Sequence, residues 1–336
     1  MSDTGVKRKK TSYAYAWTGE GDLYDQAFAL NRGRFRRARE QQRVSPDTPV
    51  RQRKQSSMTV IASSPEVKEQ LLQKHQEKAQ EIAESRVEYR QDVRQAQTEL
   101  SQAVWADTGR RWGTYNPIRL LSWWSSNTTS TAQASDTNAI RDRRDRLRAY
   151  ESALAGVPED EAIHSRMRFV EMKDLPSGKE ESQSRKLHLL GHGGPGMRGL
   201  TALQNPTKVS HIRLFNELSQ DFHQQGVLDK FGDLRMESCW SANPVRTDQY
   251  MGQHYSHKHT DIQSGETSFA PAVHLHRELK ALHPRQSFQI KAYEGKGSQI
   301  SNPIGQKQRY LTNYLGGTTV RQSTVARVFS SHKTYD

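Results

Sequence analysis

The sequence predicts an α/β fold in which helices flank a mainly parallel sheet. Short apolar segments alternate with amphipathic segments after residue 158, as in strand–helix–strand units with right-handed crossovers. Two of these apolar segments end at a His-Gly turn and at the only cysteine of the chain, where ligands meet a parallel sheet. The chain as a whole is too polar to form one compact core, with 33% hydrophobic residues and a mean hydropathy of −0.93.

We therefore expect three segments: a disordered basic leader over residues 1–60, a helical region with a Ser/Thr linker over 61–157, and the α/β domain over 158–336. The leader holds 13 Lys and Arg against 6 Asp and Glu, and it is largely aperiodic, which favours disorder. Such a charge run is typical of a solvated tail. Binding of nucleic acid by residues 1–60 is not expected, although the charge leaves it open.

The helical region begins at Ser64 and Pro65, which have the pattern of a helix cap followed by a first turn. A polar helix is expected from there to about residue 107. Its apolar residues are sparse, so a partner helix or a loose hairpin fits better than a core. A linker over 125–137 separates it from a second charged helix over about 137–155.

In the α/β domain we expect strands over 167–172, 186–190, 233–238 and 287–293, and amphipathic helices over 207–226 and 268–283. His192 and Cys239 follow the second and third of these strands. Because neighbouring parallel strands end at the same edge of a sheet, both residues belong on that edge. A thiol nucleophile needs a base within hydrogen-bond reach, and this geometry can supply one.

These segments resemble the caspase-like clan of cysteine peptidases, which includes caspases, separases, gingipain-type enzymes and the cysteine peptidase domains of bacterial toxins. The resemblance covers about residues 160–300 and rests on two motifs: Leu189-Leu190-Gly191-His192-Gly193-Gly194 and Met236-Glu237-Ser238-Cys239-Trp240-Ser241-Ala242. Caspases proper have a different stretch before the nucleophile, so identity with caspases is not implied.

The resemblance implies a cysteine endopeptidase with a His192/Cys239 dyad. Cys239 would attack the scissile carbonyl, and His192 would deliver a proton to the leaving amine. The backbone N–H groups of Gly193 and Cys239 would form the oxyanion hole. No third catalytic residue is evident from the sequence, and Glu237 is not expected to be one because it alternates to the other face of its strand.

Three other interpretations stay open. Cys239 could be an inert buried thiol, which is the common fate of an isolated cysteine. The stretch from His192 to Gly196 also matches a turn of some α/β-hydrolases, but no glycine flanks the nucleophile as their elbow requires. A zinc site at His254, His257 and His259 lacks an acidic residue or cysteine to complete it, so no metal is expected.

The formal net charge of +13 favours acidic partners, and a single cysteine fits a reducing compartment. No apolar run is long enough for a spanning helix, and the N-terminus does not have the pattern of a Sec signal. We expect a bacterial effector or toxin that leaves by a non-Sec route and cleaves a host protein, or itself, in host cytoplasm; otherwise the protein is cytoplasmic.

No cofactor is required for this chemistry. The resemblance to toxin domains implies inositol hexakisphosphate as a possible acidic host activator. Lys291, Lys296, Lys307 and Arg309 could contribute a basic surface for it, and ordinary solvated side chains explain these residues equally well. The alternative from another class is a non-enzymatic adaptor that binds a protein or nucleic-acid partner through the basic leader and the long helix.

Overall fold

The structure is a computed structural model, and it describes residues 11–44, 58–113, 131–204, 208–239, 241–242, 258–260, 267–294, 296–301, 307–310 and 319–335. The chain divides into two compact units. Unit 1 comprises Met1–His75 and Ile163–Asp336, and unit 2 comprises Gln76–Ala162. The second unit is therefore an insertion into the sequence of the first.

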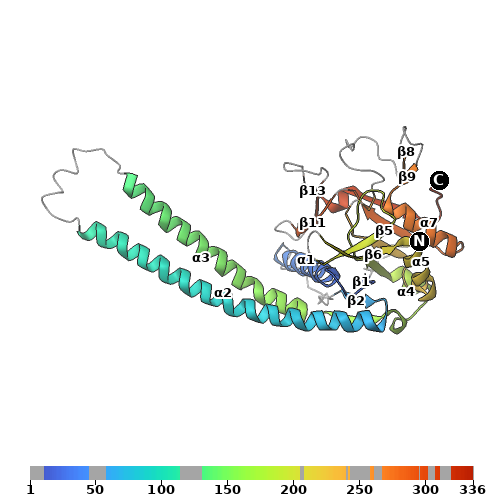
Figure 1. The fold of residues 1–336 in the computed structure, drawn as a ribbon, viewed down its shortest axis with the longest axis horizontal. Coiled ribbons are helices and arrows are strands. Elements are labelled where there is room, and N and C mark those ends of the chain that lie inside the picture. Colours follow the sequence, from blue (N-terminus) through green and yellow to red (C-terminus); the bar gives the residue numbers. More distant parts are fainter. Residues whose placement is uncertain are drawn as a thin grey trace, which may run out of the picture. The chain divides into compact units, whose positions relative to one another are not determined.

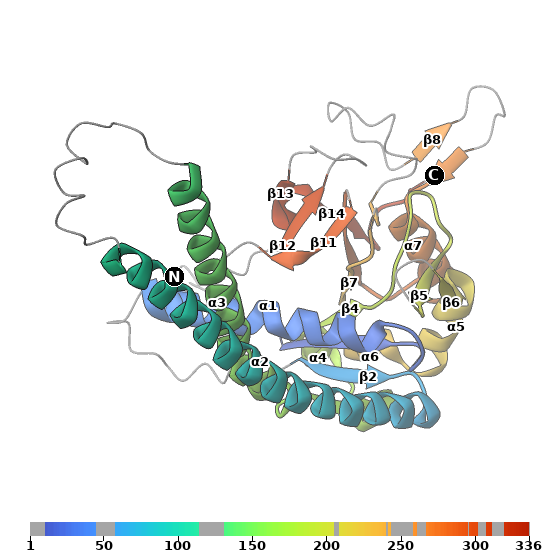
Figure 2. The same ribbon diagram turned by 60° about the vertical axis from the view of Figure 1, so that its left-hand side comes forward.

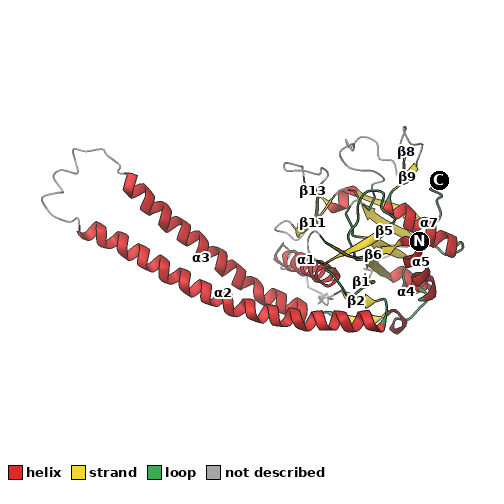
Figure 3. Cartoon of the chain, in the orientation of Figure 1, coloured by secondary structure: helices red, strands yellow, loops and turns green. Residues whose placement is uncertain are grey.

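A seven-stranded sheet of order β14-β10-β7-β4-β1-β2-β3 forms the centre of unit 1 (Figures 1 and 3). Every pairing in it is parallel except that between β10 and β14. This confirms the α/β class with a mostly parallel sheet. The strands are β1 (Thr11–Ala16), β2 (Thr59–Ala62), β3 (Arg168–Glu171), β4 (Arg185–Leu189), β7 (Asp233–Met236), β10 (Gln289–Tyr293) and β14 (Ala326–Ser330).

Helices of unit 1 flank this sheet. They are α1 (Leu23–Val44), α4 (Lys179–Ser184), α5 (Phe215–Gln224), α6 (Val227–Lys230) and α7 (Pro271–Leu282). Successive side chains of β1 point to opposite faces, and Tyr15 packs edge-on against Phe222 of α5 with ring centroids 5.0 Å apart. Ala14 and Ala16 thus point to the opposite face, where the right-handed crossover from β1 to β2 puts α1 (Figure 2).

Smaller sheets complete unit 1. Two hairpin strands, β5 (Gly199–Leu203) and β6 (Val209–Leu214), follow β4 directly. Strands β8 (Lys258–Thr260) and β9 (Thr267–Phe269) pair before α7. Strands β11 (Lys296–Ser301), β12 (Lys307–Tyr310) and β13 (Thr319–Arg321) form a third antiparallel sheet after β10.

Two calls about elements are corrected by these observations. The disordered leader expected over residues 1–60 is wrong for residues 11–44 and 59–60, because β1 lies between β4 and β2 in the sheet, α1 packs on β1, and β2 begins at Thr59. The helix expected over 207–226 is a strand followed by a shorter helix, β6 and α5. Its Val209, Ile212 and Leu214 are exposed on the hairpin instead of facing a core.

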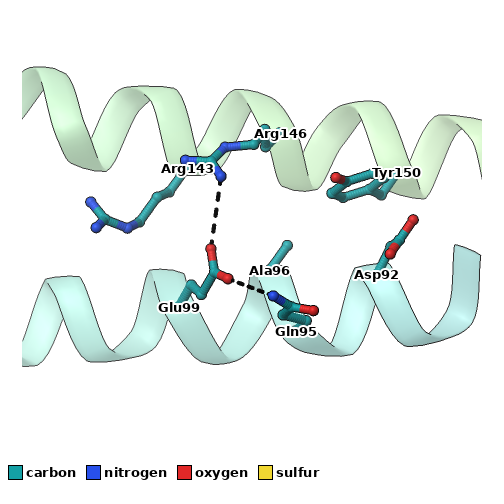
Figure 4. A pocket seen from close by; sticks show the side chains of 7 residues that line it. All are labelled: Asp92, Gln95, Ala96, Glu99, Arg143, Arg146 and Tyr150. Atoms are coloured by element: carbon teal, nitrogen blue, oxygen red, sulfur yellow. Dashed lines mark hydrogen bonds and ion pairs between the residues drawn. The ribbon is translucent and has the colours of Figure 1, made fainter.

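Unit 2 contains most of two long helices, α2 (Pro65–Gly113) and α3 (Thr131–His164). Their seam is mainly polar: Glu99 and Arg146 approach to 3.9 Å beside the buried Ala96 (Figure 4). A shallow polar pocket lies there, lined by Asp92, Gln95, Ala96, Glu99, Arg143, Arg146 and Tyr150. The expected pair of charged helices is present, although α3 continues past Pro158 to His164. The domain boundaries expected at residues 60 and 157 thus differ from the observed ones.

Candidate active site

His192 and Cys239 lie just beyond the ends of two neighbouring parallel strands. Strand β4 pairs with β7, and Leu189 is opposite Met236, so the two candidate residues each follow a paired strand end by three residues. Gly193 lies directly against the segment that holds the cysteine. A Cβ added to Gly193 would come within 3.2 Å of Ser238 Oγ and 3.3 Å of the Cys239 carbonyl oxygen. The structure therefore brings the two predicted segments together.

The backbone around His192 is held on both sides. Its N–H donates to the carbonyl of Thr201 at 2.7 Å, and its carbonyl accepts from the Thr201 N–H at 2.9 Å. This bridge ties the histidine to strand β5. The preceding Gly191 has a φ of +142°, which L side chains rarely adopt, so this turn favours glycine. These constraints fix where the imidazole leaves the backbone.

Asp22 in the loop between β1 and α1 binds the His192 ring. Its Oδ2 lies 2.5 Å from Nε2 of His192, and its Oδ1 accepts from the Leu203 N–H at 3.1 Å. Gln26, one turn into α1, donates to Oδ2 at 3.2 Å and accepts from the Gly191 N–H at 2.9 Å. The carboxylate is thus held by three donors, and it is only about a quarter exposed.

This arrangement selects one protonation pattern for His192. A 2.5 Å contact with a carboxylate oxygen requires a proton on Nε2, which leaves Nδ1 to take up or release a proton. The amide nitrogen of Gln26 also lies 2.9 Å from Nε2, and one of its two N–H groups donates to Asp22. Among the described residues, Nδ1 of His192 has no hydrogen-bond partner.

The electrostatics of Asp22 agree with an ionised carboxylate. Burial by itself raises the pKa of Asp22. The hydrogen bonds from His192, Leu203 and Gln26 and the charge of His192 lower this pKa by more, so the net shift is downward. Asp22 therefore stays negative at neutral pH, and its charge would favour a positive imidazolium on His192.

The turn that holds Cys239 is anchored by Ser241. The hydroxyl of Ser241 donates to the carbonyl of Met236 at 3.1 Å and accepts from the N–H of Tyr293 at 2.9 Å. The N–H of Ala242 also donates to the Tyr293 carbonyl at 3.1 Å. These bonds join the turn to the ends of β7 and β10, while Cys239 itself stays partly exposed.

Gly193 and Cys239, the residues expected to form an oxyanion hole, lie in neighbouring segments. Gly193 is close enough to the Cys239 segment that a side chain there would need a neighbour to shift. Its N–H makes no hydrogen bond within the part of the chain that the structure describes. Cys239 lies two residues before Ser241, whose hydroxyl donates to the Met236 carbonyl.

Glu237 forms contacts with His188 and Gln322. Its Oε1 lies 2.7 Å from Nδ1 of His188, and its Oε2 accepts from Gln322 Nε2 at 2.8 Å. Both Glu237 and His188 are only 11% exposed at their side chains, so this pair is a buried contact between β4 and the end of β7.

The remaining predicted residues are less closely defined. His254 and His257 of the open zinc interpretation lie outside the described residues, and His259 is on β8. No group of three or more metal-ligating side chains occurs in the ranges that the structure describes. Of the basic residues considered for an activator, Lys291 is on β10, Lys296 on β11, and Lys307 and Arg309 on β12.

Sequence reasoning missed Asp22 and Gln26. Residues Gly19–Asp22 form a polar turn after the alternating run Tyr13–Ala16, which is a strand-end signal of the same kind as the one before His192.

Comparisons with known proteins give no relative: no family model, no curated protein and no solved structure matches this chain. Among the described helices, none combines the length and apolarity needed to cross a membrane.

Proposed function

We propose that the protein is a caspase-like cysteine endopeptidase in which Cys239 is the nucleophile and His192 the general acid–base. The observation that carries the proposal is the pairing of two segments at one sheet edge. His192 is tied through Nε2 to Asp22, and the adjacent Gly193 packs against the Cys239 segment. A base oriented by a carboxylate beside a partly exposed thiol is the arrangement of nucleophilic acyl transfer.

The proposed reaction proceeds in two halves. Sγ of Cys239 bonds to the carbonyl carbon of the scissile peptide, its proton passes to His192, and the N–H groups of Gly193 and Cys239 hold the oxyanion. The C–N bond then breaks as His192 returns the proton to the leaving amine. Water next attacks the thioester, His192 takes one proton from it, and the acid product leaves as the thiol is restored.

Asp22 acts on His192 and is a positioning residue. It holds Nε2 protonated, so that Nδ1 is the nitrogen that exchanges a proton with the reacting groups. Its charge also favours the imidazolium that forms when the thiol loses its proton.

The test is labelling and cleavage by the full chain, with Cys239→Ala and His192→Ala beside it. A thiol-reactive peptidyl probe should add one mass equivalent to the wild type and none to Cys239→Ala, as read by intact mass. His192→Ala should slow labelling strongly, whereas His332→Ala, at an exposed histidine near the C-terminus, should not. Equal labelling of His192→Ala and the wild type would contradict the dyad.

The further expectations about biology belong to the same proposal. An effector or toxin acting on a host protein should cleave sites in a host lysate that disappear in both mutants. Running the assay with and without inositol hexakisphosphate tests the activator, and Lys291→Gln tests one residue of the proposed basic surface. An activator requires a rise in rate with the phosphate and a smaller rise in Lys291→Gln.

A second function, the non-enzymatic adaptor, is favoured by one observation in unit 2. On α2, Trp105 is 75% exposed, and Val87 and Val104 are also exposed, so apolar side chains are available on a polar helical surface. The two functions separate at Cys239: an adaptor keeps its biological effect in Cys239→Ala, whereas a peptidase loses it.

A further inference from the structure

The turn that leads into Asp22 is packed between two other segments of unit 1. Gly21 has a φ of +69°, in the left-handed region that favours glycine, and a Cβ added to it would come within 2.8 Å of the Leu203 carbonyl oxygen at the end of β5. On the other side of the turn, a Cβ added to Gly19 would overlap the side chain of Gln70 on α2. The turn therefore has β5 against one side and the first turns of α2 against the other.

Lys74 of α2 binds the backbone of this turn directly. Its partly buried ammonium group donates a hydrogen bond to the carbonyl oxygen of Gly21, which belongs to the peptide bond between Gly21 and Asp22. A charged donor makes a stronger hydrogen bond than a neutral one. Leu71, one turn earlier on α2, is fully buried and anchors this part of the helix in unit 1.

The position of the Asp22 carboxylate depends on this peptide plane. Its Oδ2 lies 2.5 Å from Nε2 of His192, and its Oδ1 accepts from the Leu203 N–H at 3.1 Å. Hydrogen bonds weaken steeply when their distance and angle depart from the optimum. Because the carboxylate leaves the chain directly after the Gly21 carbonyl, the hydrogen bond from Lys74 limits how far it can move from His192.

A second contact joins α1 to α2 beside the same turn. The hydroxyl of Tyr24, a residue only 3% exposed, lies 2.9 Å from Nδ1 of His75, which follows Lys74. The His75 ring stacks on that of His164 at 3.6 Å, and its carbonyl oxygen accepts from Nε2 of His164 at 2.7 Å. Burial and the charge of His164 lower the pKa of His75 to about 4, so His75 is neutral at neutral pH. These contacts hold the helix that carries Lys74 against α1.

We propose that Lys74 is a positioning residue of the peptidase, whose hydrogen bond to the Gly21 carbonyl keeps Asp22 in contact with Nε2 of His192. The inference rests on the proposed peptidase function and adds to it a group from α2, the helix that leads into the insertion. Lys74 acts through Asp22. Its removal should therefore resemble a weakened Asp22, and it should have no further effect where Asp22 is already replaced.

The experiment compares two substitutions in the full-length chain: Lys74→Met keeps the apolar stem and removes the donor, whereas Lys74→Arg keeps a charged donor. The first readout needs no turnover. A proton in a short hydrogen bond between an imidazole and a carboxylate resonates far downfield, and the signal from the Asp22–His192 pair is assigned by its loss in Asp22→Asn. We expect this proton signal to shift upfield or broaden in Lys74→Met and to return toward its wild-type position in Lys74→Arg.

The second readout is steady-state cleavage of a peptide that the wild type selects from a synthetic library. Lys74→Met should lower kcat by about tenfold with little change in KM, the loss of one hydrogen bond to a charged group, and Lys74→Arg should restore most of it. In the Asp22→Asn background, Lys74→Met should lower kcat no further. Should Lys74→Met fail to fold, Lys74→Gln, which keeps a shorter uncharged donor, carries the same test.

Lys68→Met is the matched control. Lys68 is on the same helix and loses a comparable contact, because its ammonium lies 3.4 Å from Glu171 on β3 and not at the Asp22 turn. It should leave the downfield signal and kcat unchanged. An equal loss in Lys68→Met, an unchanged signal or kcat in Lys74→Met, or a wild type without the downfield signal would overturn the proposal. A signal that depends on Lys74 in a protein that cleaves no peptide would keep the positioning of Asp22 and remove the peptidase.

Discussion

At the residue scale, the contact with Asp22 determines which ring nitrogen of His192 carries a proton. The carboxylate is 170 positions away along the chain, yet its Oδ2 lies 2.5 Å from Nε2 of the histidine. Gln26 joins the same group by donating to Asp22 and accepting from Gly191. Replacing Asp22 by asparagine is therefore an informative substitution. The amide has almost the shape of the carboxylate but neither its charge nor its second acceptor oxygen.

We expect Asp22→Asn to lower kcat of the proposed peptidase by about 10²-fold or more, with little change in KM, since general acid–base catalysis contributes factors of that size. The amide removes the negative charge beside the imidazolium and can favour the other ring tautomer. Steady-state kinetics on a cleaved library peptide measures the change. Asp25→Asn, at an exposed carboxylate on the next turn, is the control. A KM effect with unchanged kcat would contradict the positioning role.

The same substitution predicts a difference in acid stability. The folded pKa of Asp22 is below its ordinary value of 3.8, so its contribution to stability is fully present above pH 3.8 and is lost as the pH falls through the folded pKa. The wild type should lose more free energy of unfolding than Asp22→Asn below about that pH. Chemical denaturation of both proteins across the acid range measures this, and parallel losses would contradict it.

At the element scale, β1 carries more of the fold than its composition indicates. It lies between β4 and β2, and its Ala14, Tyr15 and Ala16 are fully buried. Its end also leads to the turn that presents Asp22. The strand therefore joins the two halves of the sheet and supplies one group of the candidate site.

We expect deletion of residues 1–16 to prevent unit 1 from folding, because it removes a central strand and leaves the facing edges of β2 and β4 unpaired. Deletion of residues 1–9, which ends before β1, is the matched control and should leave folding intact. Circular dichroism and size-exclusion chromatography distinguish the two. A folded, soluble protein without residues 1–16 would contradict the central role of β1.

An element can be predicted from the sequence when its own residues are enough to define it, and not when its neighbours in the sheet define it. Strands β4 and β7 are predictable because continuous buried runs such as Leu187–Leu190 precede turn signals. Strand β1 was missed because Thr11–Ala16 is short and lies between charged segments, so that only its neighbours in the sheet make it a strand. The candidate residues His192 and Cys239 can be placed at strand ends from the sequence, whereas the contact of Asp22 with His192 joins segments that are distant in the sequence.

At the scale of the whole molecule, the helical unit 2 is an insertion into a crossover. Strands β2 and β3 pair in parallel with Thr59 opposite Arg168, although more than a hundred residues separate them. The two ends of the insertion meet within unit 1: the rings of His75 and His164 stack at 3.6 Å, and His164 Nε2 lies 2.7 Å from the carbonyl oxygen of His75. Because the chain leaves unit 1 and returns to it at one point, the insertion can be removed without moving β2 or β3.

We expect replacement of residues 77–161 by a Gly/Ser linker of about six residues to leave unit 1 folded, because such a linker spans the short distance between the helix stubs. Cys239 should keep its reactivity toward a peptidyl probe, and thermal unfolding should remain a single transition. The variant also separates the two proposed functions. A peptidase keeps cleaving short peptides without unit 2, whereas an adaptor that uses the exposed surface around Trp105 loses its partner. Loss of Cys239 labelling in a variant that still folds would make unit 2 part of the active site.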